Sequence, residues 1–197
     1  MTARIAKISR STNETKISVE VNLDGTGKAE LNSGVGFFDH MLDQIARHAM
    51  VDLKVTCEGD THIDDHHSVE DIGIALGQAF KEALGNKAGI YRYGHFALAM
   101  DEALVETALD FSGRGFLVFD VAIPASKIGT FDTELVQEFF QAFAINAGLT
   151  LNMRRITGTN SHHIVEACFK SAARAIRIAI EMDPRNAGVI PSTKGTI

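Results

Sequence analysis

The sequence predicts an α+β protein whose chain consists of two similar halves. Segments of alternating apolar and polar residues, typical of strands, are interspersed with longer segments that have apolar residues at helical spacing. This order of elements occurs twice along the 197 residues. In each half, two adjacent histidines and a glutamate open a long helix. These motifs are His66-His67-x-x-Glu70 and His162-His163-x-x-Glu166. A repeated motif at the same point of a repeated order indicates an internal duplication.

Composition and charge exclude several classes of protein. A hydrophobic fraction of 45% with 22% charged residues is typical of a soluble globular protein. The formal charge of -6 disfavours binding to nucleic acids or membrane surfaces, and no apolar run approaches the roughly 18 residues that span a bilayer. Residues 1–6 lack the features of a signal peptide, and Cys57 and Cys168 form no disulfide framework. We therefore expect a cytoplasmic protein that binds neither nucleic acid nor membrane.

The first half should begin with strands and end with a long helix. Residues 17–23 alternate between apolar and polar side chains, and the turn-forming Asp24-Gly25-Thr26-Gly27 follows them. Gly85 with Asn86 is a suitable cap for the end of the long helix. The expected elements are strands 4–10 and 15–23, a short third strand, helix 38–50, strand 51–57 and a helix from about 68 to 84.

The second half should repeat this order. Ser112-Gly113-Arg114-Gly115 ends a strand as Asp24-Gly25-Thr26-Gly27 does, and Pro124 ends the next one. The expected elements are strands 104–111 and 116–123, helix 133–147, strand 149–156 and a helix from 160 to about 182. We therefore expect a single domain built of two repeats, at about 1–90 and 91–185, with a C-terminal tail of residues 186–197.

The two histidines of each motif should face different neighbours. Successive residues of a helix are separated by about 100°, so Glu70 lies roughly 40° from His66 and 60° from His67. Either histidine could therefore share a metal ion with Glu70. His66 and His67 themselves point about 100° apart, which makes it difficult for both to bind one ion. The motif is better suited to a position between two ions, with one histidine for each.

The duplication supplies further candidate ligands. Aligning the earlier helices of the two halves places His40 opposite Glu138, and both side chains can bind metal. The eight candidates are His40, His66, His67, Glu70, Glu138, His162, His163 and Glu166. Shared between two ions, they give four ligands each and leave positions open on an octahedral ion, which favours a catalytic role. Imidazole and carboxylate without thiolate suit Mn, Fe, Co, Ni or Zn.

Three features could bind phosphate, and each also has an ordinary explanation. Lys170 lies one helical turn beyond Glu166, where it could bind an anion near the metal or pair with that glutamate in solvent. Arg114 lies in the turn of the second half, where a plain surface role is also adequate. The tail Pro191-Ser192-Thr193-Lys194-Gly195 is either a disordered end or a flap, since its hydroxyls, lysine and flexible glycine could close over a phosphate.

Longer motifs extend these observations along the chain. They are Thr12-Asn13-Glu14-Thr15, Leu23-Asp24-Gly25-Thr26-Gly27, Phe38-Asp39-His40-Met41-Leu42-Asp43-Gln44, Gly59-Asp60-Thr61-His62-Ile63-Asp64-Asp65-His66-His67, Arg92-Tyr93-Gly94, Met100-Asp101-Glu102-Ala103-Leu104, Asn160-Ser161-His162-His163 and Pro191-Ser192-Thr193-Lys194-Gly195. With these stretches the chain closely resembles the imidazoleglycerol-phosphate dehydratase family of histidine biosynthesis. The resemblance covers essentially all of the sequence.

This resemblance implies a metal-dependent hydro-lyase that converts D-erythro-imidazole glycerol phosphate into imidazole acetol phosphate and water. It implies two Mn²⁺ ions per active site and a homo-oligomer, a cubic assembly of about 24 subunits with active sites at subunit interfaces. The implied fold is a duplicated half-domain of the ribosomal protein S5 domain 2-like type, in which two sheets flank a layer of helices. The chain is similar to the monofunctional form. It departs from many relatives at Glu138, where they have histidine, so the charge at this ligand differs.

The resemblance also implies roles for single residues. Glu14, in the Thr-x-Glu-Thr stretch, is implied as the catalytic base. The residues that match family positions near the substrate or its phosphate are Gln44, His48, Arg92, Asp101, Arg114, Lys170, Ser192 and Lys194. The tail 186–197 would cap the substrate.

Two other functions are compatible with the metal motifs. A two-metal phosphatase or hydrolase would attack phosphorus with a metal-bound hydroxide, but bridging aspartates would be expected in place of this imidazole-rich set. Alternatively, the motifs could be metal staples that hold an oligomer together, in which case Glu14 would have no role. Phosphate release and substitution of Glu14 separate these functions from a dehydratase.

Overall fold

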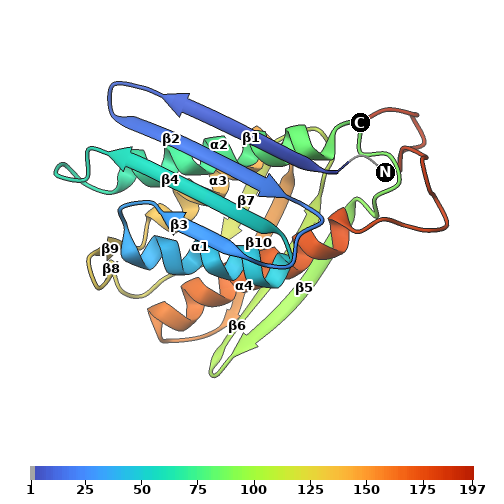
Figure 1. Cartoon of the computed structure of the whole chain (residues 1–197). Coiled ribbons are helices and arrows are strands. Elements are labelled where there is room, and N and C mark those ends of the chain that lie inside the picture. Colours follow the sequence, from blue (N-terminus) through green and yellow to red (C-terminus); the bar gives the residue numbers. More distant parts are fainter. Residues whose placement is uncertain (1–2) are drawn as a thin grey trace.

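Two four-stranded sheets enclose a layer of four helices in the computed structural model, which describes residues 3–197 (Figure 1). The first half contains β1 (Ile5–Ser11), β2 (Thr15–Asn22), β3 (Ala29–Asn32), α1 (Gly36–Ala49), β4 (Asp52–Gly59) and α2 (His66–Leu84). The second half contains β5 (Tyr93–Met100), β6 (Ala103–Asp110), β7 (Phe116–Asp120), α3 (Leu135–Ala147), β10 (Thr150–Thr157) and α4 (Ser161–Ile180). A short hairpin of β8 (Lys127–Ile128) and β9 (Phe131–Asp132) lies between β7 and α3.

The two sheets have the same topology. The first has the strand order β1-β2-β4-β3 and the second the order β5-β6-β10-β7, so that β10 takes the place of β4. In each sheet the first three strands in this order are antiparallel neighbours, and the last strand pairs with the third in parallel. Equal strand order and equal directions, together with the repeated motif, confirm the predicted α+β fold with an internal duplication.

Several elements differ from the prediction. The strand β5, Tyr93–Met100, was not expected, because alanine, leucine and methionine fill much of it and its apolar residues do not alternate strictly with polar ones. The hairpin of β8 and β9 was also not expected, and the strand predicted at 116–123 ends at Asp120. The long helix of the first half begins at His66, slightly earlier than predicted.

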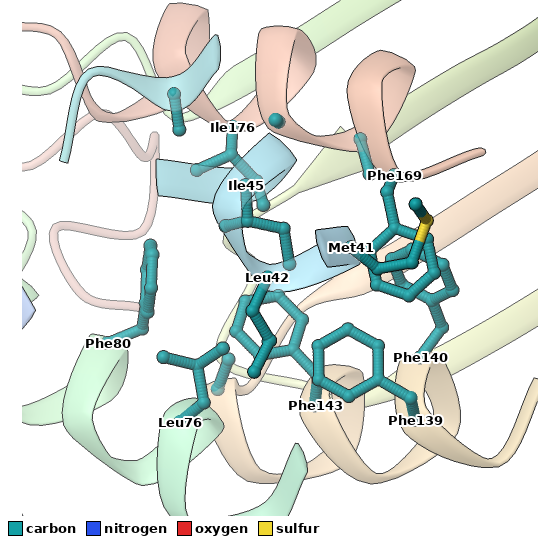
Figure 2. Close-up of a cluster of buried hydrophobic side chains, with 14 of the residues drawn as sticks. Met41, Leu42, Ile45, Leu76, Phe80, Phe139, Phe140, Phe143, Phe169 and Ile176 are labelled. Carbon is teal, nitrogen blue, oxygen red and sulfur yellow. The ribbon is translucent and has the colours of Figure 1, made fainter. Parts of the chain in front are cut away.

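The core lies between the sheets, where all four helices contribute side chains to one apolar cluster (Figure 2). Phenylalanine supplies much of its volume. The rings of Phe139 and Phe140 lie 5.2 Å apart, and both contact Phe169, at 5.3 and 4.8 Å. Each fully buried aromatic side chain contributes a large apolar area, so this cluster helps to fix how α3 and α4 lie relative to each other within the helix layer.

Helix packing determines which ends of the helices meet. α2 packs on β1 and β2 and against α3, whereas α4 packs on β5 and β6 and against α1. Two sets of neighbours show that α1 and α4 run in the same direction. His40 near the start of α1 lies beside Glu166 near the start of α4. His48, further along α1, is close to Lys170 and Arg174, further along α4. Within the described residues, no helix is both long and apolar enough to cross a lipid bilayer.

Candidate metal centre and substrate pocket

Three of the predicted metal ligands converge where α1 and α4 begin. The Nε2 atom of His162 lies 3.0 Å from Oε2 of Glu166, and Nε2 of His40 lies 3.4 Å from the same oxygen. One ligand atom from each of the three residues lies within 4.8 Å of the other two. Two imidazoles and one carboxylate at this spacing can hold a single metal ion.

Local structure holds the two histidines of this group in place. His162 lies in the first turn of α4, where the side chain of Asn160 caps the helix by accepting hydrogen bonds from the backbone N–H groups of His162 and His163. The ring of Phe37 packs edge-on against both imidazoles, with its centroid 5.3 Å from that of His162 and 6.4 Å from that of His40. The cap therefore fixes the backbone of His162, and the ring of Phe37 limits the movement of both imidazoles.

The carboxylate of this group is ionised. The side chain of Glu166 is only 9% exposed, and this burial by itself would raise its pKa. The ammonium of Lys170 opposes that effect, with Nζ 2.5 Å from Oε1, and the imidazoles of His162 and His40 add to it. The net result is a lowered pKa for Glu166, which suits a carboxylate that binds a cation.

The corresponding group of the first half is more open. His66 and Glu70 on α2 have the same i,i+4 relation as His162 and Glu166, with Nε2 of His66 3.9 Å from Oε2 of Glu70. Glu138 on α3 is half-buried, and α3 packs against α2 as α1 packs against α4. In residues 3–197, however, these three side chains do not converge into a second group of ligands.

The second histidine of each motif turns away from the first. Nδ1 of His67 lies 3.0 Å from a carboxylate oxygen of Asp60, and Nδ1 of His163 lies 2.7 Å from Glu102. These hydrogen bonds raise the pKa of both imidazoles. Hydrogen bonds from the imidazole and from two backbone N–H groups lower the pKa of Glu102 to about 2. The remaining ring nitrogen of His163, Nε2, faces Asp101 at 3.8 Å.

Glu14 lies in the turn between β1 and β2 and faces His67. Its carboxylate is half-exposed, with Oε1 3.7 Å from Nε2 of His67. The hydroxyl of Thr12 accepts hydrogen bonds from the backbone N–H groups of Glu14 and Thr15. The hydroxyl of Thr15 in turn donates to the buried carboxylate of Asp71 on α2, at 2.5 Å. The turn is thereby tied to the helix that carries the first histidine pair.

Polar residues continue from the metal-ligand group along α1 and α4. Nε2 of Gln44 lies 3.4 Å from Nδ1 of His40, one turn further along α1. His48 follows after another turn, and its pKa is lowered by burial and by the positive charges of Lys170 and Arg174 on α4. Lys170 thus places a positive charge beside the candidate metal ligands, and the lowered pKa of His48 favours its neutral form. Both side chains are suited to contact with a polar, anionic molecule.

A pocket of about 630 Å³ lies at the other end of the molecule. The predicted phosphate-binding residues that line it are Arg92, Arg114, Ser192 and Lys194. Arg92 donates two hydrogen bonds to Asp110, at 2.6 and 3.0 Å, and a third to the carbonyl of Pro191, at 2.7 Å. The tail therefore packs over this pocket, with two arginines and a lysine around it.

The predicted site residues thus fall into two regions of one chain. The backbone N–H of Arg92 donates to the carbonyl of Ala179, in the last turn of α4, whereas Glu166 lies near the start of that helix. At about 1.5 Å per residue, the two positions are roughly 20 Å apart. Lys170 stays with the metal ligands and does not line the pocket of Arg92.

Several residues around the site were not predicted from the sequence. Asp60 and Glu102 belong to longer motifs but have no predicted role, because a carboxylate beside a histidine is recognisable only when the two are seen together in space. Phe37 and Asp71 were not among the candidate site residues either. Acidic residues cluster around the first histidine pair, whereas Glu166 is the one acidic residue close in sequence to the second pair, so the sequence held no signal for Glu102.

Comparison with known proteins identifies the family of this chain. Residues 33–176 match the sequence model of the imidazoleglycerol-phosphate dehydratase family. The chain is 65% identical to the imidazoleglycerol-phosphate dehydratase of Dinoroseobacter shibae over 194 residues, which cover 98% of this chain and all of the relative. It is 64% identical to that of a Jannaschia species, with the same coverage.

Solved structures support the same relationship. The crystal structure of the dehydratase from Staphylococcus aureus matches with a TM-score of 0.83 and 40% identity, covering 90% of this chain and 99% of the other. The structure from Pyrococcus furiosus matches with a TM-score of 0.83 and 34% identity, covering 96% and 100%. The chain therefore belongs to the imidazoleglycerol-phosphate dehydratase family and is a hydro-lyase of histidine biosynthesis.

Proposed function

We propose that this chain dehydrates D-erythro-imidazole glycerol phosphate to imidazole acetol phosphate, and that the reaction depends on two Mn²⁺ ions per active site. One observation carries the metal dependence: His40, His162 and Glu166, far apart in the sequence, bring their ligand atoms within 4.8 Å of one another. An imidazole- and carboxylate-rich group of this kind is suited to a catalytic divalent ion with open positions.

The donor set of the chain fits two such ions. His40, His162 and Glu166 would hold one of them, since these residues already converge and the glutamate is ionised. The other would use the duplicate set, which consists of His66, Glu70 and Glu138, with His67 and His163 completing the two sites. When bound to the ring nitrogens of the substrate, the ions would supply Lewis acidity that favours the imidazolate form.

The side chains of the protein supply the proton transfer. In the proposed reaction, the hydroxyl on the carbon attached to the ring leaves, and the carboxylate of Glu14 removes the hydrogen from the neighbouring carbon. The resulting enol takes up a proton at the ring-attached carbon and becomes the ketone, so that one molecule of water is lost overall. Glu14 is suited to this role, because its carboxylate is half-exposed on a backbone held by Thr12 and beside the metal-ligating His67.

The phosphate is assigned to the cationic residues. Arg92, Arg114, Ser192 and Lys194 surround one pocket, and the tail packs over it through Pro191. Lys170 and Gln44 lie beside the metal ligands instead, with His48 near them. We assign these, together with Asp101 near His163, to the substrate portion that faces the metal.

The separation of the two regions supports active sites shared between subunits. Imidazole glycerol phosphate is much shorter than the roughly 20 Å of α4 that separate Glu166 from the pocket of Arg92. One substrate molecule can contact both regions only if they come from different chains. We therefore propose a homo-oligomer, about 24 subunits in a cubic arrangement, in the cytoplasm.

A reconstitution assay tests the proposal. The purified protein is treated with a chelator, assayed with imidazole glycerol phosphate, and assayed again after Mn²⁺ is added. We expect formation of imidazole acetol phosphate to disappear with the chelator and to return with Mn²⁺. Failure to restore dehydration would contradict the metal dependence, and release of inorganic phosphate from the same substrate would favour a two-metal phosphatase.

A further inference from the structure

We infer that Asp60 and Glu102 are positioning residues, which orient the imidazoles of His67 and His163 so that Nε2 of each is presented to a metal ion. This inference rests on the proposed function, because it takes both histidines to be metal ligands. It concerns residues that are not ligands themselves, and it assigns the same task to one carboxylate in each half of the chain.

The geometry of the two pairs is alike. Both oxygens of Asp60 lie near Nδ1 of His67, at 3.0 and 3.2 Å, and one oxygen of Glu102 lies 2.7 Å from Nδ1 of His163. A neutral imidazole that donates its Nδ1–H to a carboxylate carries its lone pair on Nε2. The carboxylate thus selects the tautomer and the rotation of the ring that a metal requires.

The opposite nitrogen is left available in both cases. Nε2 of His67 lies 3.7 Å from Glu14, and Nε2 of His163 lies 3.8 Å from Asp101, which are too far for hydrogen bonds. The two imidazole side chains are 32% and 26% exposed, so their outer nitrogens remain accessible from solvent. A histidine held on one side and open on the other is prepared to bind an ion at the surface of its own chain.

The two carboxylates come from positions that the duplication does not relate. Asp60 lies in the loop between β4 and α2, seven residues before His67. The corresponding loop of the second half, between β10 and α4, is shorter and contains only Gly158-Thr159-Asn160. It has no carboxylate. Glu102, which is 61 residues from His163 in the sequence, reaches the same ring atom from the turn between β5 and β6.

The shorter loop holds Glu102 in place. The backbone N–H groups of Thr159 and Asn160 donate to Oε1 of Glu102, at 3.0 and 2.7 Å, while Oε2 faces His163. A carboxylate thus contacts Nδ1 of the second histidine in both halves, but it comes from the loop before the helix in one half and from a strand turn in the other. The contact was therefore not copied with one loop when the half was duplicated, and what the two halves share is the orientation of the second histidine.

Metal binding without turnover provides the test. Mn²⁺ affinity is measured from the electron paramagnetic resonance signal of free Mn²⁺, for the wild type and for the variants Glu102→Gln and Asp60→Asn. We expect each variant to bind Mn²⁺ about 10- to 100-fold more weakly at one of its two kinds of site. Glutamine retains an oxygen that can accept the backbone N–H groups at 159 and 160, so the turn should be preserved.

The chain offers a matched control. Oε1 of Glu106 lies 2.9 Å from Nε2 of His95, outside both regions of the site, so Glu106→Gln breaks a similar pair and should leave Mn²⁺ affinity unchanged. A second comparison places Glu102→Gln in a His163→Ala background. If Glu102 acts through His163, the added substitution should not weaken Mn²⁺ binding further.

The outcomes separate this inference from the proposed function. If the wild type binds no Mn²⁺, the proposed function fails. If the wild type binds Mn²⁺ and folded Glu102→Gln and Asp60→Asn bind it with unchanged affinity, the positioning role is wrong and the proposed function stands. A further loss of affinity from Glu102→Gln in the His163→Ala background would assign Glu102 a general structural role instead.

Discussion

At the scale of single residues, Glu14 combines a fixed backbone with a carboxylate that remains open to substrate. The hydroxyl of Thr12 accepts hydrogen bonds from the backbone N–H groups of Glu14 and Thr15. The hydroxyl of Thr15 donates to Asp71 on α2, which ties the turn to that helix. The carboxylate of Glu14 itself is 52% exposed and makes no hydrogen bond to the neighbouring His67 at 3.7 Å. If Glu14 is the base, as proposed, it can reach a proton on a bound substrate without first breaking a strong contact.

The substitution Glu14→Gln tests this role directly. It removes the proton acceptor while keeping the size of the side chain, so we expect turnover to fall by about 10²- to 10⁴-fold. Mn²⁺ content and assembly should stay close to the wild type, because Thr12 holds the backbone at this position and the carboxylate is 3.7 Å from its charged neighbour, His67. Kinetics with imidazole glycerol phosphate provide the measurement. Glu20→Gln, at an exposed position of β2, is the control, and normal turnover of Glu14→Gln would exclude it as the base.

At the scale of elements, the crossing of α2 and α3 depends on two glycines. A Cβ atom at Gly73 would lie 2.9 Å from both the carbonyl oxygen of Phe139 and the Cβ of Ala142. A Cβ at Gly77 would lie 2.7 Å from the carbonyl oxygen of Phe143. These distances are too short for real contacts, so glycine allows the two helix backbones to approach each other closely. That approach brings the start of α2, with its histidines, into position.

We therefore expect Gly77→Ala to destabilise the protein. The atoms it would meet include backbone atoms of α3, which cannot rotate away, so the helices must separate at a cost of about 1–3 kcal/mol. Urea denaturation at a fixed protein concentration measures the change. Gly36→Ala is the matched control, since no atom lies within 4 Å of a Cβ at that position. Equal stability of the two variants would show that the crossing tolerates a methyl group.

At the scale of the whole molecule, the site residues lie at opposite ends of the helix layer. The turn that carries Glu14 and the start of α2 are at one end, and the C-terminal tail, which packs over the pocket of Arg92, is at the other (Figure 1). Under the proposed function, a single chain therefore carries two incomplete parts of a site. Assembly of several chains can complete them if one end of a subunit meets the other end of its neighbour.

Complementation between two inactive variants tests this arrangement. Glu14→Gln and Lys194→Ala remove groups at opposite ends of the chain, and we expect each variant alone to be nearly inactive. In assemblies of both, made by coexpression in equal amounts, about one quarter of shared sites should contain both intact groups, if mixing is random. The dehydratase activity of the mixture measures this. Activity no higher than that of the separate variants would mean that each site is built from one chain.

Much of the fold could be predicted, because its signals are local. Alternation in the residues of β2 and helical spacing in α1 are set by the faces that these elements bury. β5 could not be predicted in this way, since its alanines, leucine and methionine are common in helices and only pairing with β6 makes them a strand. The contact between His163 and Glu102 could not be predicted for the same reason, because the two residues are 61 positions apart in the sequence and only the fold brings them together.

The sequence by itself determined the duplication, the eight candidate ligands and the divergence of each histidine pair, since these follow from repeated motifs and from helix geometry. The tertiary structure alone decided which ligands meet. His40 and Glu166 are 126 residues apart, and packing of α1 against α4 brings them to 3.4 Å. It also placed Arg92 and the other residues predicted to bind phosphate at the opposite end of α4. The physical reason is that local periodicity selects elements, whereas their side-chain packing selects the partners of each residue.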